Sequence, residues 1–123
     1  MKPRKRQVRS ASKKNDSQRR KATTAMLDEL IEEATIDAYG ESEQTTGFFT
    51  MLEDHLALPF KAEVLGVHVT VERIEMTDDE QIVAVCASGK SRQRIPIIDL
   101  PVPAKPPEGS EWIAAYRRWV HGR

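Results

Sequence analysis

Apolar residues recur at two different spacings along the chain, and the spacing changes twice. From about residue 25 to residue 58 it is three to four residues, which is typical of helices with one buried face. From residue 60 to residue 95 it is two residues, which is typical of strands. Helical spacing returns near residue 108. This order predicts an α+β domain with two N-terminal helices, a small antiparallel sheet and a C-terminal helix.

The two N-terminal helices are predicted over residues 25–38 and 42–56. On the first, the apolar stripe and the opposite acidic face each contain four residues: Leu27, Leu30, Ile31 and Ala34, and Asp28, Glu29, Glu32 and Glu33. Gly40 is expected to end this helix, because glycine readily adopts the positive φ found at helix C-termini. Ser42 is the expected N-cap of the second helix, which Pro59 prevents from continuing.

The strand region contains one irregularity. A reversal of side-chain parity predicts a β-bulge near Glu72 and Arg73, because one extra residue reverses the two faces of a strand. The sheet is therefore expected to be small and bent, or to close into an SH3-like barrel. Residues 82–87 are apolar on both faces and are predicted to form the most buried strand. The next strand, over 91–95, is expected at an edge because Pro96 follows it.

The C-terminal helix is predicted from its stripe of large apolar residues. This stripe contains Trp112, Ala115, Tyr116, Trp119 and Val120. Their spacing places all of them on one helix face. We expect this face, with its two tryptophans, to close the core.

Charge divides the chain into two parts. Residues 1–24, the leader, hold ten basic side chains and one acidic side chain and carry +9; the remainder carries −9, because the total is zero. Val8 is the leader's only branched aliphatic residue, so the leader is expected to be unfolded and residues 25–123 to form one acidic domain. Since the chain has neither an apolar run of 18 residues nor an apolar segment behind its first charges, we expect a soluble cytoplasmic protein.

Features associated with catalysis are weak. The run 89–91, Gly-Lys-Ser, is similar to the end of a phosphate-binding loop, but Ala84 occupies the position where that loop needs a glycine, so a hairpin turn is predicted. Cys86 lies in the most apolar strand, where a thiol is usually a small inert hydrophobe. The three histidines are far apart, and no EF-hand loop is present. We therefore expect a protein that is not an enzyme.

Acidic residues flank the predicted corner at Gly40. Asp37, Glu41 and Glu43 lie there, beside the last carbonyl groups of a helix, which carry negative partial charge. Calcium takes six to eight oxygen ligands, so converging carboxylates and carbonyls are the donors it needs. A solvated acidic face explains the same spacing.

Glu53 and Asp54 form a second acidic cluster further along the second helix. Glu41 and Glu53 are separated by about 18 Å of helix at 1.5 Å per residue. The two clusters could share one ion only if the helix broke, and Gly47 is the obvious place for a break.

Several runs resemble the CcbP-like family of small bacterial calcium-binding proteins. They are Ile-Asp-Ala-Tyr-Gly-Glu-Ser-Glu-Gln at 36–44, Phe49, Glu53-Asp54, Leu-Pro-Phe-Lys-Ala at 58–62 and Ala-Tyr-Arg-Arg-Trp at 115–119. The resemblance covers about residues 30–121. It implies a compact α+β domain that binds Ca²⁺ without an EF-hand, through surface carboxylates. The long basic leader lies outside this range, and the acidic run at 78–80 is not among the matching runs.

The leading hypothesis is reversible calcium binding, as a buffer or a sensor. Its expected ligands are Asp37, Glu41 and Glu43, followed by Glu53 and Asp54. The alternative is an adaptor that docks on nucleic acid or the ribosome through the leader, because a chain rich in cations binds phosphate backbones without sequence preference. Arg92 and Arg94 could extend that basic surface, although the net −9 of the domain opposes wide contact with phosphate.

Overall fold

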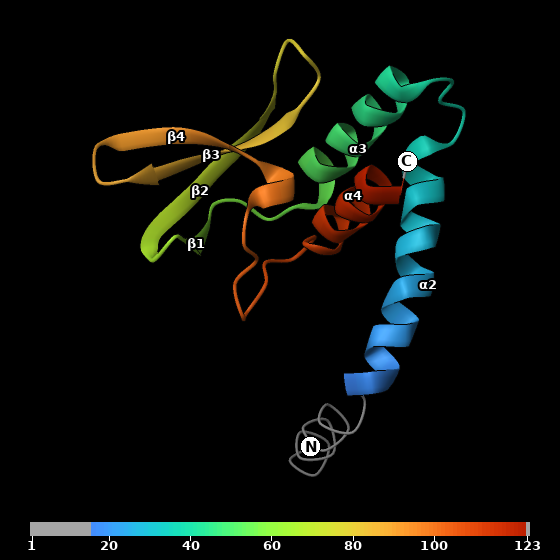
Figure 1. The fold of residues 1–123 in the computed structure, drawn as a ribbon, viewed down its shortest axis with the longest axis horizontal. Coiled ribbons are helices and arrows are strands. Elements are labelled where there is room, and N and C mark those ends of the chain that lie inside the picture. The colour runs from blue at the N-terminus through green and yellow to red at the C-terminus, as the bar shows by residue number, and fades with distance from the viewer. Residues whose placement is uncertain (1–15, 123) are drawn as a thin grey trace.

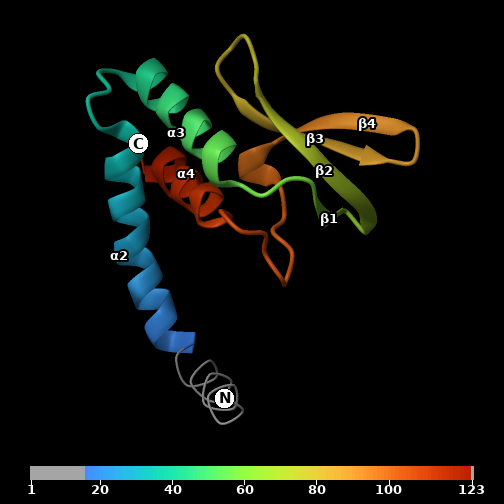
Figure 2. The ribbon, with the colours of Figure 1, turned by 180° about the vertical axis from the view of Figure 1, so that it is seen from behind.

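The computed structural model describes residues 16–122, with side chains from residue 24 onward. In chain order the elements are α2 (Asp16–Thr35), α3 (Glu41–His55), β1 (Phe60–Val64), β2 (Val67–Met76), β3 (Ile82–Ser88), β4 (Ser91–Pro96), the 3₁₀ turn η1 (Ile97–Asp99) and α4 (Glu111–Gly122). The sheet lies on one side of the molecule and α2 on the other, with α3 and α4 between them (Figures 1 and 2). The predicted α+β class and element order are confirmed.

Helix α2 differs from its prediction at both ends. It begins at Asp16 rather than near residue 25, so residues 16–24, the end of the expected unfolded leader, are helical. Residues 1–15 lie outside the described part of the chain. The helix ends at Thr35, before Gly40, because Asp37 already takes a left-handed conformation with φ 58°.

Helix α3 begins one residue earlier than predicted. Gly40, with φ 101° and ψ 162°, is its N-cap, and Ser42 lies inside the first turn rather than capping it. A glycine at the N-cap contributes no side-chain hydrogen bond. The orphan N–H groups of the first turn therefore lack the hydroxyl acceptor that the sequence suggested.

Gly47 does not break α3, which continues unbroken through this position. It instead lets α2 and α3 approach closely. A Cβ atom at Gly47 would lie 2.0 Å from the backbone oxygen of Ala34 on α2. The next residue, Phe48, is fully buried, and its ring centroid lies 5.4 Å from that of Tyr116 and 5.1 Å from that of Trp119 on α4. The glycine and the aromatic together dock α3 against both other α-helices.

The four strands form an antiparallel meander in the order β1-β2-β3-β4. The predicted bulge is confirmed, since the β2–β3 register shifts between Val71 and Arg73. Residues 82–86 of β3 are all buried, and β4 lies at an edge, as predicted. Because β1 and β4 do not pair, the sheet is bent but open, and the barrel alternative is wrong.

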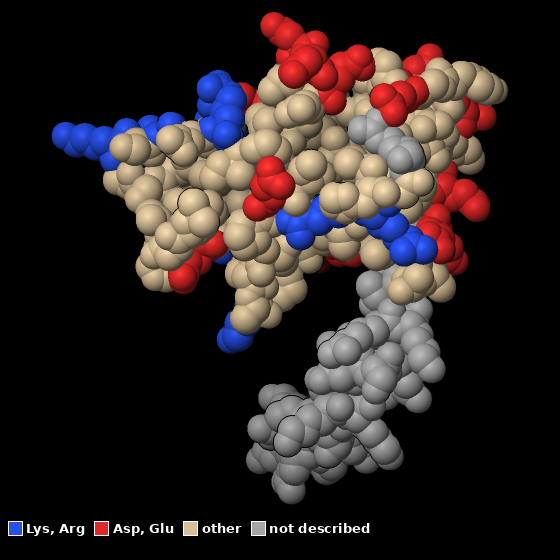
Figure 3. Space-filling view, in the orientation of Figure 1, with Lys and Arg blue, Asp and Glu red and all other residues tan. Residues whose placement is uncertain are grey.

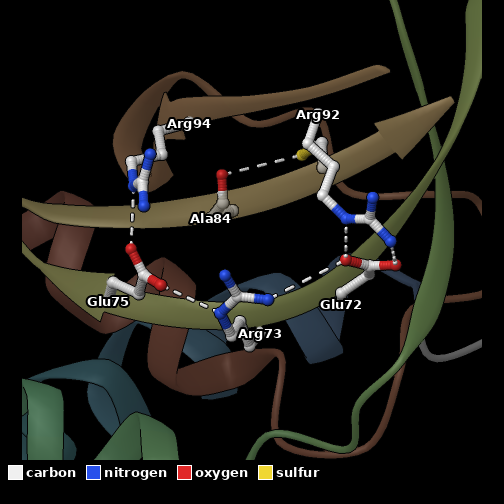
Figure 4. A network of polar contacts seen from close by, with 7 residues as sticks. Glu72, Arg73, Glu75, Ala84, Arg92 and Arg94 are labelled. Atoms are coloured by element: carbon white, nitrogen blue, oxygen red, sulfur yellow. Dashed lines mark hydrogen bonds and ion pairs between the residues drawn. The ribbon is translucent and has the colours of Figure 1, made fainter. Parts of the chain in front are cut away.

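Arginines neutralise the acids on one face of this sheet (Figure 4). The Nε of Arg92 donates to Glu72 at 2.8 Å, and the Nε atoms of Arg94 and Arg73 donate to Glu75 at 2.8 and 2.9 Å. These hydrogen bonds hold the pKa of both glutamates below the usual value. Because Arg92 and Arg94 are paired within the sheet, they add little to any basic surface.

Asp28 also has a partner. Although it was expected on the solvent face of the first helix, its carboxylate accepts a 2.8 Å hydrogen bond from Nε of Arg118, which joins α2 to α4. The pair is half exposed, so its contribution to stability is small.

The C-terminal helix closes the core as predicted. Trp112, Ala115 and Tyr116 are buried, and Trp119 and Val120 pack against the same cluster. None of the helices in the described part of the chain has the length and apolar character needed to span a membrane.

We predict that Gly47→Ala destabilises the protein. The added methyl group must push the α2 backbone away from α3, and overpacking of this kind costs about 1–3 kcal/mol, more than the gain of about 1 kcal/mol from replacing a helical glycine by alanine. Urea unfolding monitored by circular dichroism measures the change.

Gly122→Ala is the matched control, because it makes the same substitution in a helix where the new Cβ meets nothing within 4 Å. It should be neutral or slightly stabilising. Equal effects of the two substitutions would contradict the close crossing.

Candidate functional site

Three of the predicted site residues lie at the α2–α3 corner. Asp37, Glu41 and Glu43 are all exposed there. Asp37 supplies the left-handed residue that ends α2, a conformation that aspartate adopts more readily than most residues. Glu41 and Glu43 lie in the first turn of α3, where the helix dipole favours a negative charge. The local backbone thus accounts for an acid at each position, even without a metal ion.

Glu43 stabilises the corner directly. Its Oε1 accepts a 2.7 Å hydrogen bond from the backbone N–H of Tyr39, the residue before the N-cap. The arrangement resembles a capping box, in which a glutamate in the first turn reaches back to satisfy a backbone donor. One oxygen of this carboxylate is therefore already occupied.

Glu41 faces acids from a distant part of the chain. It lines a cavity of about 240 Å³ together with Asp79 and Glu80 of the β2–β3 turn. Two hydroxyl residues of α3, Ser42 and Thr45, line the same cavity. Figure 3 shows acidic side chains gathered at this end of the molecule, over the β2–β3 turn and the N-terminal part of α3. Carboxylate and hydroxyl residues from two separate elements thus line the same cavity.

The β2–β3 turn holds its acids in a defined conformation. The N–H of Thr77 donates to the Gln81 carbonyl at 2.9 Å, and the N–H of Gln81 donates to the Thr77 hydroxyl at 3.0 Å. That hydroxyl in turn donates to the Asp79 carboxylate, and Glu80 takes a positive φ of 65°. Residues 78–80 were not among the ligands expected from the sequence. Three consecutive acids were the available signal for a role at this site.

Glu53 and Asp54 are exposed near the other end of α3. Because α3 is continuous, about 18 Å of helix separates Glu41 from Glu53. The structure therefore does not bring the two predicted clusters together. The adjacent His55 ring stacks on Trp112, with centroids 5.4 Å apart.

Among residues 24–122, no group of three or more histidine, cysteine, aspartate or glutamate side chains lies close enough to hold a metal ion. In the same part of the chain, Asp37, Glu53 and Asp54 form no salt bridge with a lysine, arginine or histidine. The α2–α3 corner and the β2–β3 turn thus supply anionic oxygens that are near one another but not converged on a point.

The cysteine is placed as predicted. Cys86 is 3% exposed in β3, and burial raises the pKa of its thiol. A thiolate is therefore disfavoured at this position, which is expected for a small core residue.

Comparisons with known proteins agree with this architecture. A family model described as calcium binding matches residues 28–120. A solved structure of a calcium-binding protein in its calcium-binding form matches 79% of this chain and 90% of its own, with a TM-score of 0.64 and 21% identity. At that identity the likeness shows the fold. The comparison with curated proteins gave no match.

We predict that Glu43→Ala lowers the free energy of unfolding by about 1 kcal/mol, because the Tyr39 N–H loses its acceptor and the α3 N-terminus loses a charge. Glu43→Gln keeps an oxygen acceptor and should lose less than half as much. Thermal unfolding of both variants at moderate salt measures the difference. Equal losses would show that charge, and not the hydrogen bond, is what Glu43 contributes.

Proposed function

Because the chain belongs to the CcbP calcium-binding family, for which Ca²⁺ is the ion, we propose that its folded domain binds Ca²⁺ reversibly through carboxylates. The observation that carries this proposal is the cavity that Glu41 shares with Asp79 and Glu80. Asp37 lies in the loop that leads into the same helix and is the further expected ligand. The role is that of a calcium buffer or sensor rather than an enzyme.

The donor set suits calcium. Ca²⁺ is a hard cation that accepts carboxylate, carbonyl and water oxygens in flexible geometry at 2.3–2.6 Å. The α2–α3 corner and the β2–β3 turn supply carboxylates, with hydroxyls beside them. Magnesium demands a tighter octahedral arrangement and dehydrates reluctantly, so it should compete poorly for donors that lie on two separate elements.

Ion binding requires movement of side chains. Carboxylates of like charge repel one another, which favours separated rotamers until a cation offsets the repulsion. Glutamate side chains in the first turn of a helix and in a turn can rotate without disturbing the core. We therefore propose that Ca²⁺ draws Glu41 and the acids of the β2–β3 turn together and that water completes its coordination.

Glu53 and Asp54 are proposed as a second, weaker site. They are adjacent in sequence and lie near the C-terminal end of α3, where unpaired carbonyl groups carry negative partial charge. Because α3 separates them from Glu41, an ion bound there would be independent of the first one.

We predict that the protein binds Ca²⁺ with a dissociation constant on the order of 10⁻⁶–10⁻⁴ M, the range of sites weaker than dedicated buffers. Glu41→Gln, and separately Asp37→Asn, should weaken binding at the first site at least about tenfold, roughly 1.4 kcal/mol. Each substitution removes one negative charge while keeping the shape of the side chain. Isothermal titration calorimetry at moderate salt measures the affinities.

Glu111→Gln is the matched control for Glu41→Gln. Like Glu41, Glu111 is the exposed first residue of an α-helix, but it lies on α4 and does not line the cavity. If the control weakened binding as much as Glu41→Gln, the ion would be held by diffuse attraction to an acidic protein. An absence of calcium heat at millimolar concentration would refute the proposed function itself.

The alternative role as a nucleic-acid- or ribosome-associated adaptor is supported by the ten basic residues of the leader. We predict that any binding to an RNA duplex weakens steeply between 50 and 200 mM salt, because each neutralised phosphate releases counterions. Replacing the leader's basic residues by glutamine should abolish it. Binding that survived both changes would contradict docking through the leader.

A further inference from the structure

Three exposed glutamates on α2 have no salt-bridge partner among the described side chains. Glu29, Glu32 and Glu33 are exposed, and no lysine, arginine or histidine in the described part of the chain forms a salt bridge with them. Spacings of three and four residues place Glu29 beside the other two, and such like-charge pairs destabilise a helix. Figure 3 shows acidic side chains along the α2 side of the molecule, up to the end near the corner. Within the part of the chain described with side chains, these three glutamates thus have no counterpart of the arginines that pair with the acids of the sheet.

The segment before α2 has the opposite charge. Residues 1–15 contain seven basic side chains and no acidic one, and they join the chain at Asp16, the first residue of α2. Fifteen residues span at most about 50 Å, and the distance along α2 from Asp16 to Glu33 is about 26 Å at 1.5 Å per residue. The segment is therefore long enough to reach the acidic face of α2 and the α2–α3 corner.

We propose that residues 1–15 dock on the acidic face of their own α2 and compete with Ca²⁺ for the negative potential at the α2–α3 corner. This inference rests on the proposed calcium site. A tethered segment meets its target at a high effective concentration, so modest charge attraction suffices for docking. In calcium-free protein the segment supplies counter-charge to Glu29, Glu32 and Glu33. When Ca²⁺ binds, the potential falls and the segment is released.

Two consequences distinguish this competition from an N-terminal segment that has no effect on calcium binding. The coupling is reciprocal. If docking of the segment weakens calcium binding, calcium binding must weaken docking of the segment by the same factor. The coupling is also electrostatic and acts across the protein surface. Because the screening length falls to about 3 Å at 1 M salt, high salt must remove the coupling. Released by calcium, the segment would become available to external polyanions.

The test compares the native full-length chain with one variant and one control of the same length. In one variant the seven basic residues of segment 1–15 are replaced by glutamine; in its control the same fifteen residues are kept in permuted order. Calorimetry with CaCl₂ at 20 mM and 500 mM NaCl gives the affinities. At low salt the neutralised variant should bind calcium at least about fivefold more tightly than the native and permuted chains. At high salt the three should agree within about twofold.

Nuclear magnetic resonance provides a readout that does not depend on calcium. Without calcium at low salt, neutralising the segment should shift the backbone amide signals of residues 28–43, while signals of the β3–β4 hairpin stay unchanged. Equal calcium affinities at low salt and unshifted amides would overturn the proposed docking.

The outcomes also separate this inference from the proposed function. If no variant binds calcium while the amide shifts appear, the calcium proposal fails and docking of the segment stands alone. If the low-salt difference depends on protein concentration, as measured by analytical ultracentrifugation, the segment acts between molecules and the intramolecular proposal is wrong.

Discussion

The close crossing of α2 and α3 is the constraint on which the arrangement of the helices depends. At Gly47 the two backbones approach so closely that even a methyl group on α3 would collide with the Ala34 carbonyl. This approach places Phe48 in the core, between α3 and the aromatic stripe of α4. With α3 held at both faces, its first turn lies beside the β2–β3 turn, and Glu41 comes to share a cavity with Asp79 and Glu80. The site proposed for calcium thus depends on a packing contact that contains no charged group.

The acidic side chains fall into two groups, which differ in whether arginines pair with them. On the sheet, Glu72 and Glu75 are paired with arginines of neighbouring strands, and the pKa of each carboxyl is lowered by those hydrogen bonds. Because these carboxylates already accept hydrogen bonds from arginines, they attract a cation only weakly. Glu29, Glu32 and Glu33 on α2 and Asp37 at the α2–α3 corner are exposed and form no salt bridge within the described part of the chain, so their negative potential remains available. The proposed calcium site and the proposed docking of residues 1–15 both use this second group, and their competition follows from that shared use.

The calcium-binding assignment comes from the family match and not from the fold alone. The match to a calcium-binding family over residues 28–120 assigns the ion, whereas the likeness to a solved structure at 21% identity concerns the fold. Assignment of individual ligands depends on the chemistry of each side chain. Glu43 illustrates the point, because one of its oxygens caps a helix while its charge could still attract a cation.

The amino-acid sequence by itself determined the features that depend on local periodicity. The α+β class, the bulge near Arg73, the buried strand over 82–86 and the apolar stripe of α4 all follow from which side chains must share a face. It also placed acids at the corner, since charge is visible in any sequence. Local patterns did not reveal contacts between residues far apart in the chain.

Only the tertiary structure decided those contacts. It showed that α2 starts at Asp16, that Gly47 permits a helix crossing instead of a break, and that Asp28 pairs with Arg118. It also brought Glu41 to the acids of the β2–β3 turn, about 40 residues away. The physical reason is the same in each case. Periodicity records which face of an element is buried, but the partner that buries it is chosen by how all the elements pack together.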